Sequence, residues 1–181
     1  MRVAIIGAGF FGTSCAIRLA KKHTIHIFEK KETILCGASR ANQLRFHLGY
    51  HYPRSQKTIS EIKKNYKEFI KFFGQDVFAK TKNYYGISRE KSRTNYNDYL
   101  KFLKKNKLQF KKTNIKDFSK KIEGQIISNE KNLNYFKIKK KILKKLKNKN
   151  IQIFFKVNFN KKLLNNYDKV ILATYDNNNE L

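Results

Sequence analysis

Three glycines and one glutamate near the start of the chain have the spacing of a site that binds a dinucleotide. Gly7, Gly9 and Gly12 form a Gly-x-Gly-x-x-Gly sequence. In such a site the first glycine permits a tight turn, the second lets the backbone approach a pyrophosphate, and the third lets a helix pack closely on a strand. Glu29 follows Gly9 at the spacing at which an acidic side chain binds a ribose hydroxyl. An acid at this position would repel a 2′-phosphate, so NADP is disfavoured.

The segments around this motif have the periodicities that the site requires. Arg2–Ile6 is an apolar run typical of a buried strand, Phe10–Lys22 has helical spacing, and Thr24–Glu29 is a second apolar run. The unpaired N–H groups at the start of the helix would face the phosphates, where they favour an anion by roughly 0.3–1 kcal/mol. Without this context the glycines would indicate only an ordinary α/β turn. With it they predict a dinucleotide site.

A second segment, Ala38–Ser55, is rich in side chains that form hydrogen bonds and has little apolar periodicity. Such a segment cannot bury itself well, so we expect it to line a polar site. Pro53, the only proline, ends it in an extended or turn conformation. It contains Ser39, Arg40, Asn42, Gln43, Arg45, His47, Tyr50, His51, Tyr52 and Arg54.

The rest of the chain alternates between patterns typical of helices and of strands. Helices are predicted at Ser55–Phe73, Thr94–Lys105 and Ile138–Leu146, and strands at Tyr84–Ser88, Leu108–Lys112, Gln125–Ser128, Leu133–Phe136, Ile151–Val157 and Lys169–Ala173. The last two strands are apolar enough to be buried in a parallel sheet. We therefore predict an α/β fold in which a Rossmann-like sheet, formed by residues 1–55 and 137–181, is interrupted by an α+β insertion at residues 56–136.

The chain is strongly basic, with 41 Lys and Arg residues against 13 Asp and Glu and a formal net charge of +28. Such a charge can indicate a nucleic-acid partner. However, 34 of the basic residues are lysine and only seven are arginine, whereas specific recognition of bases and phosphates usually favours arginine. The lysines accompany many Asn and Ile residues and are spread through every segment after Pro53. We interpret them as a compositional bias that coats the surface, and predict no nucleic-acid partner.

The sequence also argues against a membrane or secreted protein. No run approaches the ~20 apolar residues that a membrane span needs, and the apolar run after Met1 is too short for a signal peptide. The basic helix predicted at Ile138–Leu146 has a narrow apolar face without an aromatic anchor, so we expect no stable membrane insertion. Cys15 and Cys36 are too few for a disulfide framework or a zinc site. We therefore predict no metal and a reducing, cytoplasmic setting.

These motifs resemble those of the flavin-dependent oxidoreductases of the D-amino-acid oxidase (DAO) superfamily. Val3–Glu29 is similar to their FAD-binding fingerprint, and Asp168–Thr174 to their late strand, an aspartate before an apolar run that ends in Ala-Thr. Tyr175 departs from the pattern, because the superfamily usually has glycine there. The more specific similarity is to the branch that contains 2-hydroxyglutarate dehydrogenase, in which Asn, His, Gly and Tyr recur at the spacing of Asn42, His47, Gly49 and Tyr52.

The resemblance implies FAD as the cofactor and a small hydroxy acid or amine as the substrate, oxidised by hydride transfer to the flavin. The pyrophosphate would lie at the glycine turn, the adenosine ribose at Glu29, and the phosphates and ribityl chain near Ser39, Arg40 and Asn42. The full set of cofactor-binding residues implied in this way is Gly7, Gly9, Phe10, Phe11, Gly12, Glu29, Lys30, Ser39, Arg40, Asn42, Gly49 and Thr174.

The resemblance also places His47, Tyr50 and His51 near the flavin ring. An ordinary imidazole titrates near pH 6.5, so His47 is the candidate catalytic base that takes a proton from a substrate hydroxyl or amine. Tyr50, His51 and Arg54 are candidate substrate-binding residues, and Arg54 is suited to pair with a carboxylate through two hydrogen bonds. The alternatives are that each histidine is a structural hydrogen-bonding residue and that Arg54 is a surface arginine.

Enzymes of this superfamily are considerably longer than this chain, and a C-terminal segment completes their substrate pocket. We therefore expect the chain to be an N-terminal portion that needs a missing C-terminal half or a partner chain, and to be inactive alone. Two other functions fit the opening motif, an NAD-dependent dehydrogenase and a nucleotide-binding protein without catalysis. The segment Ala38–Ser55 favours the flavin enzyme, since a nicotinamide enzyme would normally continue directly into its next strand and helix.

Overall fold

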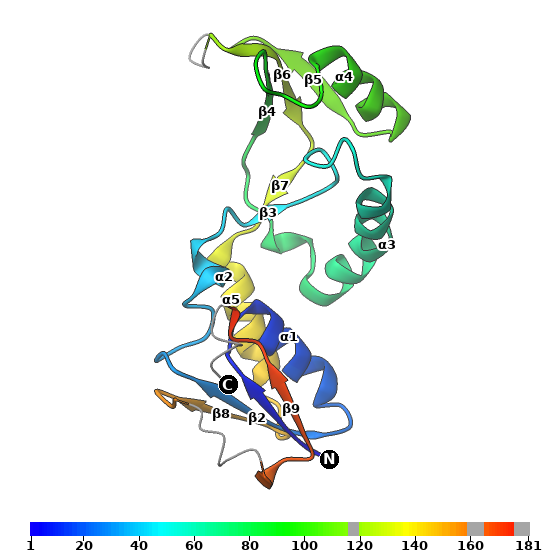
Figure 1. Ribbon diagram of the computed structural model, residues 1–181. Helices are drawn as coiled ribbons and strands as arrows, with labels where there is room; N and C mark the ends of the chain where they lie inside the picture. The colour runs from blue at the N-terminus through cyan, green and yellow to red at the C-terminus, as the bar shows by residue number, and fades with distance from the viewer. Residues whose placement is uncertain (116–119, 159–164, 176–181) are drawn as a thin grey trace. The chain divides into compact units, whose positions relative to one another are not determined.

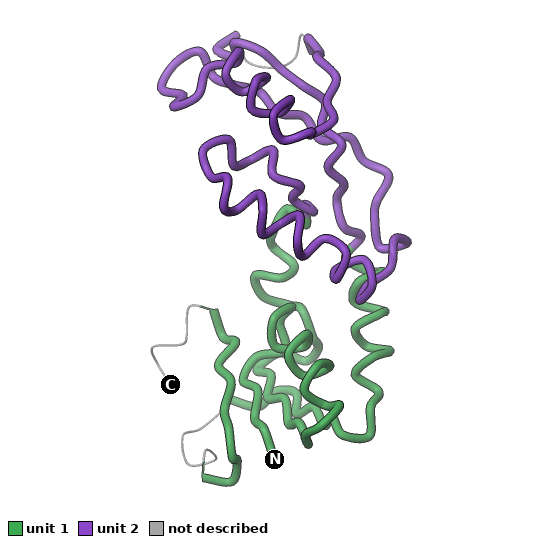
Figure 2. The backbone as a smooth tube through the Cα atoms, turned by 90° about the vertical axis from the view of Figure 1, so that its right-hand side faces the viewer, with its two compact units in different colours: residues 1–44, 135–181 green, residues 45–134 purple. Residues whose placement is uncertain are grey.

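A computed structural model describes residues 1–115, 120–158 and 165–175 of the chain. The backbone divides into two compact units (Figure 2). Unit 1 combines Met1–Leu44 with Tyr135–Leu181, and unit 2 is the intervening segment Arg45–Asn134. An interrupted fold is what the sequence predicts, although the boundaries lie at 44/45 and 134/135 rather than at 55/56 and 136/137.

Unit 1 contains a parallel four-stranded sheet, as predicted (Figure 1). Its strands are β1 (Arg2–Ile6), β2 (Thr24–Glu29), β8 (Ile151–Phe155) and β9 (Lys169–Leu172), in the spatial order β8-β2-β1-β9. β1 pairs with β2 on one side and with β9 on the other. The chain thus leaves the sheet after β2 and returns to extend it at both edges, which makes β1 and β2 the central, most buried strands.

Two helices of unit 1, α1 (Phe10–Leu19) and α5 (Tyr135–Leu146), pack against each other beside the sheet (Figure 1). On α5 the inward-facing side chains are Ile138, Ile142 and Leu146, which recur every four residues, and lysines occupy most of the remaining positions. α1 ends at Leu19 rather than at the predicted Lys22, because the N–H groups of Lys22 and His23 both donate to the Leu19 carbonyl in a turn. A short helix, α2 (Ala38–Ala41), follows later in this unit.

An aromatic cluster also packs against the unit 1 sheet. The rings of Phe28 and Phe154 stack with their centroids 5.1 Å apart, and Tyr167 meets Phe28 edge-on. Nearby, an Asp168 carboxylate oxygen accepts the Arg2 backbone N–H at 2.6 Å. Asp168, which precedes β9, therefore joins the start of β9 to the start of β1 through a hydrogen bond.

Unit 2 is built on an antiparallel three-stranded sheet of β4 (Asn83–Ser88), β6 (Ile122–Ser128) and β5 (Phe110–Thr113), in that spatial order. Helix α4 (Tyr96–Lys105) packs Tyr99, Leu100 and Leu103 against Ile126 and Tyr50 in the core of this unit. The remaining elements of unit 2 are the two-stranded pair β3 (Arg45–Phe46) and β7 (Lys131–Asn132), helix α3 (Gln56–Phe73) and the 3-10 turn η1 (Gln75–Val77).

Local signals explain the bounds of α3, and one predicted strand is wrong. The Ser55 side chain accepts the Thr58 N–H and caps the start of α3, while Gly74, with φ +78°, follows its end. No strand covers Leu133–Phe136, because Leu133 forms only an isolated bridge and α5 already begins at Tyr135. The aromatic run here favours a strand locally, but Tyr135 and Phe136 instead form the start of α5, where Phe136 is 77% exposed.

Within the described residues, every helix is too short or too polar to cross a lipid bilayer.

Candidate functional site

The glycine turn between β1 and α1 is fixed by close backbone packing. Gly7 has φ +100°, a conformation that L side chains rarely adopt, and its N–H donates to the Phe28 carbonyl at 2.8 Å. A Cβ at Gly7 would lie 2.6 Å from the Ala173 carbonyl oxygen, and one at Gly12 only 2.0 Å from the Gly7 carbonyl oxygen. The turn, the end of β9 and the start of α1 therefore meet where there is no room for side chains.

Gly9 differs from its two neighbours because its surroundings are open. Its φ of −69° suits any residue, and a Cβ there would meet a single atom within 4 Å among the described residues, Ser39 Oγ at 3.3 Å. Neither backbone strain nor internal packing therefore explains this glycine. A ligand that lies directly against the backbone, such as a pyrophosphate, requires a residue without a side chain at this position.

The start of α1 is suited to an anion. Its N-cap residue is Gly9, which has no side chain that could accept the N–H groups of the first turn. The Phe10 N–H donates to Ser39 Oγ at 2.9 Å, so Ser39 is brought to the turn from a distant part of the sequence. Phe11, a predicted cofactor neighbour, is 81% exposed. A phosphate placed here would meet both the helix N-terminus and the Ser39 hydroxyl.

Glu29 lies beside the same turn. One of its carboxylate oxygens accepts the Ala8 N–H at 2.7 Å and the other accepts the Lys31 N–H at 2.9 Å. These two bonds fix the direction of the side chain, and each oxygen keeps a second lone pair for a ribose hydroxyl. Lys30 is exposed just after β2. The acid that the spacing singles out is therefore held at the glycine turn.

The other predicted cofactor-binding residues of unit 1 are less tightly defined by the structure. Arg40 is exposed on α2. Asn42 accepts the Leu44 N–H at 2.7 Å, which supports a local turn in which Leu44 has φ +49°. Thr174 follows Ala173, the residue after β9 whose carbonyl oxygen lies against Gly7. Tyr175 has φ +64° and is 80% exposed, so the backbone here adopts a conformation that favours glycine.

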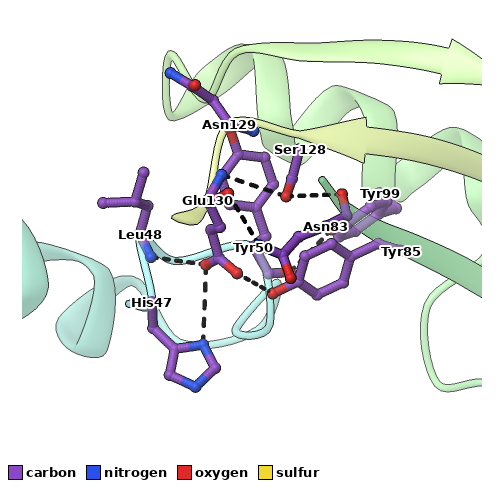
Figure 3. A network of polar contacts seen from close by, with 9 residues as sticks. All are labelled: His47, Leu48, Tyr50, Asn83, Tyr85, Tyr99, Ser128, Asn129 and Glu130. Atoms are coloured by element: carbon purple, nitrogen blue, oxygen red, sulfur yellow. Dashed lines mark hydrogen bonds and ion pairs between the residues drawn. The ribbon is translucent and has the colours of Figure 1, made fainter. Parts of the chain in front are cut away.

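Unit 2 holds a polar network around one buried carboxylate, that of Glu130 (Figure 3). The Glu130 side chain has no exposed surface. Its Oε1 accepts the Leu48 N–H at 2.7 Å, and its Oε2 accepts the Tyr85 hydroxyl at 2.5 Å. The same Oε1 lies 3.8 Å from His47 Nδ1. The candidate base is therefore adjacent to a buried acid that lies 83 positions away in the sequence.

The backbone around Glu130 is held as firmly as its side chain. The Asn83 amide donates to the Glu130 carbonyl at 3.0 Å, and the Ser128 hydroxyl donates to the Asn83 carbonyl at 3.1 Å (Figure 3). On the other side of the network the Arg45 guanidinium lies 5.2 Å from the centre of the Tyr85 ring. The segment that joins β6 to β7 is thereby fixed in place, and Glu130 with it.

The electrostatic environment favours neutral His47 and neutral Tyr85. Burial lowers the pKa of His47 below its ordinary value of 6.5; Glu130 opposes this effect, while Arg45 and His51 add to it. Burial raises the pKa of Tyr85, and its hydrogen bond to Glu130 raises it further. His47 thus has the protonation state of a base, and Tyr85 is a permanent donor to the Glu130 carboxylate.

Two predicted site residues belong to the core of unit 2 instead. Tyr50 is 1% exposed, its hydroxyl donates to the Gln109 carbonyl, and its ring stacks on Tyr85. The prediction that its side chain contacts the substrate is therefore wrong. Gly49 is buried with φ +114°, and a Cβ there would lie 3.3 Å from a side-chain carbon of Ile59, so the fold alone explains this glycine.

His51 and Arg54 are exposed. The His51 ring lies 6.0 Å from that of His47, which keeps it a candidate for substrate contact. Arg54 forms none of the ion pairs found among the described residues, and its predicted role stays a prediction. The sequence did not single out Glu130 or Tyr85, and it named Arg45 only as one polar residue of the segment Ala38–Ser55. The structure brings these three residues together around His47.

Comparison with known proteins identifies the family. The family described as FAD dependent oxidoreductase (DAO) matches residues 2–173. The chain belongs to this family. FAD is accordingly its cofactor, and Gly9, the start of α1 with its glycine N-cap, and the fixed carboxylate of Glu29 fit the pyrophosphate and ribose of such a group. The proposed 2-hydroxyglutarate dehydrogenase-like branch is a finer assignment than this match provides.

Two curated relatives are consistent with this family assignment. The chain is 31% identical to the FAD-dependent monooxygenase FPY4 of Fusarium mangiferae over 98 residues, covering 54% of this chain and 27% of that protein. It is 35% identical to the FAD-dependent monooxygenase kojA of Aspergillus flavus over 78 residues, covering 42% of this chain and 18% of that protein. The matches thus span about a quarter or less of these relatives.

The fold is similar to those of several solved oxidases. Glycine oxidase from Geobacillus kaustophilus superposes with a TM-score of 0.61 at 14% identity, covering 86% of this chain and 47% of that structure. The amino acid oxidase NikD superposes with a TM-score of 0.65 at 10% identity, covering 97% of this chain and 52% of that structure. L-alpha-glycerophosphate oxidase from Mycoplasma pneumoniae with FAD bound superposes with a TM-score of 0.56 at 18% identity, covering 86% of this chain and 44% of that structure. These likenesses show the fold, and the chain spans about half of each structure.

Proposed function

We propose that this chain forms the FAD-binding part of an oxidoreductase that oxidises a small hydroxy acid or amine. The observation that carries the proposal is the glycine turn of unit 1, where backbone packing requires Gly7 and Gly12 but a Cβ at Gly9 would meet only Ser39 Oγ among the described residues. A glycine without a backbone clash, beside the N-terminus of a helix whose N-cap residue has no side chain, indicates a ligand whose phosphates lie against the backbone. The family membership makes that ligand FAD.

Each part of unit 1 has a role in holding this cofactor. The pyrophosphate lies against Gly9 and the first turn of α1, with the Ser39 hydroxyl as a further partner. Glu29 accepts hydrogen bonds from the adenosine ribose hydroxyls through the lone pairs that its backbone bonds leave free. Arg40, Asn42 and Thr174 are proposed to line the rest of the cofactor. When bound, FAD supplies the hydride acceptor that the protein itself lacks.

In unit 2, His47 is the proposed base. Burial keeps its imidazole neutral near pH 7, so it is able to take a proton from a substrate hydroxyl or amine while the adjacent C–H bond loses its hydride. Its position in the Asn-His-Gly-Tyr spacing supports a substrate of the 2-hydroxy-acid type. His51 and Arg54 are proposed to bind the substrate carboxylate.

We further propose that turnover requires protein beyond these 181 residues, either a further segment of a longer chain or a partner chain. The family structures are about twice as long as the part that this chain matches. Nucleic acid is not a proposed partner, because lysine dominates the positive charge. The free thiols of Cys15 and Cys36 are compatible with a cytoplasmic setting.

A monooxygenase is the second candidate, favoured by the two curated relatives that bear this name. The two reactions differ in what reduces the flavin. An oxidase or dehydrogenase takes the electrons from the substrate itself, whereas a monooxygenase of this cofactor class takes them from a nicotinamide before oxygen reacts.

The test begins with the purified chain reconstituted with FAD. Bound flavin is expected to absorb at about 375 and 450 nm, values typical of the cofactor. Without oxygen, 2-hydroxy acids, amines and NADH are then added separately, and the 450 nm band is followed. Flavin that binds but stays oxidised is the result expected if turnover requires further protein. Bleaching by a hydroxy acid or amine supports the proposed substrate class but contradicts that requirement, and bleaching by NADH alone favours the monooxygenase. A chain that retains NAD but no flavin would contradict both.

A further inference from the structure

We propose that Glu130 is a positioning residue for His47, which holds the ring hydrogen on Nδ1 and leaves Nε2 as the atom that takes the substrate proton. The inference rests on the proposed function for the role of His47 as base. Neither the sequence pattern nor the family match assigns a role to Glu130.

The first support is the position of the two side chains. His47 Nδ1 is buried and has no hydrogen-bond partner among the described residues, although a buried ring nitrogen normally has one. Glu130 Oε1 lies 3.8 Å away, and the same oxygen accepts the N–H of the next residue, Leu48. The carboxylate therefore anchors the backbone that carries the ring and faces the ring nitrogen. A small rotation of the imidazole would bring Nδ1–H into a hydrogen bond.

The second support is the cost of burying Glu130. A carboxylate without exposed surface is stable only where donors surround it. Leu48 N–H and the Tyr85 hydroxyl supply two, and both are neutral. The only group within ion-pair distance of this carboxylate among the described residues is His47. A carboxylate beside the candidate base, whose two hydrogen-bond donors are both uncharged, is suited to respond when the imidazole gains a proton.

The reaction step follows from this arrangement. The substrate O–H or N–H bond breaks and its proton moves to His47 Nε2. FAD, when bound, would supply the acceptor for the hydride that leaves the adjacent carbon, where a C=O or C=N bond forms. His47 becomes an imidazolium with Nδ1–H directed at Glu130. Arg45 and His51 also face the ring and oppose its positive charge, so Glu130 is the group that compensates it.

The test is nitrogen NMR of the full chain labelled with ¹⁵N-histidine, with the His47 signals assigned from their loss in a His47→Asn variant. In the unsubstituted protein the neutral ring is expected to carry its hydrogen on Nδ1. In Glu130→Gln, which keeps the shape and the acceptor for Leu48 N–H, the two tautomers are expected to mix, and the pKa of His47 to fall further because burial is no longer opposed.

Glu90→Gln is the matched control, since Glu90 is an exposed acid of the same unit. It removes the same charge and should leave the tautomer and the pKa unchanged. A purely structural Glu130, which only binds the Leu48 N–H, predicts an unchanged tautomer in Glu130→Gln, although the lost charge would still lower the pKa of His47. An unchanged tautomer would overturn the inference.

The measurement separates this inference from the proposed function, because it requires neither flavin nor substrate. If Glu130→Gln does not fold, the tautomer of His47 in the unsubstituted protein tests the proposal by itself. A neutral His47 with its hydrogen on Nε2 contradicts the proposal regardless of any variant, whereas a failure to bind flavin would leave the NMR result standing.

Discussion

The two units hold their candidate sites in different ways. In unit 1 the site is made of backbone: at two glycines a Cβ would clash with backbone atoms, and at a third it would meet only the Ser39 hydroxyl oxygen among the described residues. In unit 2 the site is made of side chains that come from separate strands and loops and converge on the Glu130 carboxylate (Figure 3). A backbone site is tied to residue types at fixed spacing, whereas a side-chain network can be assembled from any positions that the fold brings together.

The difference predicts that substitutions in the glycine turn will have the larger effects. The largest is expected for Gly12→Ala, whose Cβ would lie 2.0 Å from the Gly7 carbonyl oxygen. Neither backbone can yield without separating α1 from β1, so the free energy of unfolding should fall by about 3 kcal/mol or more. Urea unfolding measures this loss. Gly37→Ala is the matched control, because its Cβ would meet nothing within 4 Å.

If Gly12→Ala is as stable as the unsubstituted chain, α1 is able to shift away from β1. Backbone packing would then constrain unit 1 less than it does unit 2. Comparable losses in Gly12→Ala and Gly37→Ala would show instead that the packing at Gly12 is unimportant.

Gly9→Val is expected to separate binding from folding in the same turn. The Cβ meets only Ser39 Oγ, so circular dichroism and unfolding should stay close to those of the unsubstituted chain. The branched side chain would occupy the space proposed for the pyrophosphate, so FAD affinity should fall about 100-fold or more, which corresponds to about 2.7 kcal/mol. Titration of the protein with FAD measures the change, and flavin at full occupancy in the variant would refute the proposed placement.

In unit 2 a single lost hydroxyl should have a moderate effect. Tyr85→Phe removes one of the two neutral donors to a buried carboxylate and leaves the ring packing unchanged. We expect the free energy of unfolding to fall by about 1–2 kcal/mol, the typical cost of an unsatisfied buried acceptor. Tyr66→Phe, at a 38% exposed side chain, is the control and should be nearly neutral. Equal effects of the two variants would mean that the Glu130 network contributes little to stability.

The sequence predicts the architecture of unit 1 well for a physical reason. Gly7, Gly9, Gly12 and Glu29 fall within one contiguous strand-turn-helix-strand segment, so their spacing reports their geometry directly. The apolar runs of β8 and β9 are equally clear because both strands belong to a parallel sheet. The strand predicted at Leu133–Phe136 fails because the local preference of aromatic residues for strands is overridden where Tyr135 and Phe136 begin helix α5.

The site in unit 2 was only half predictable. His47 was found through the segment Ala38–Ser55, but the same reasoning gave Tyr50 a substrate contact that its burial excludes. Glu130 had one weak signal, since it is the only acidic residue between Glu123 and Asp168 in a lysine-rich stretch. Its partners are a backbone N–H and a tyrosine hydroxyl, which no residue spacing identifies. Such a network becomes visible only when the strands are placed.

The smallest expected effect is a pH dependence of unit 2 that comes from His47. Burial lowers the pKa of the folded imidazole below 6.5, so the folded state binds its proton later than the unfolded state does as the pH falls. Above pH 6.5 the ring is neutral in both states and contributes nothing. Below it the unfolded state is protonated first, and stability decreases until the pH reaches the folded pKa.

The His47 side chain is 37% exposed, so solvent screens much of this effect. We expect the loss in the free energy of unfolding that comes from His47 protonation to be no more than about 0.5 kcal/mol. Urea unfolding at pH 7 and at pH 5.5 should show a smaller loss of stability for His47→Gln than for the unsubstituted chain. His51→Gln, at an exposed neighbouring ring, is the control. A larger loss in His47→Gln at low pH would mean that Glu130 outweighs burial and that protonated His47 stabilises unit 2, so that the side-chain network would act as an ion pair rather than as a neutral base held beside a carboxylate.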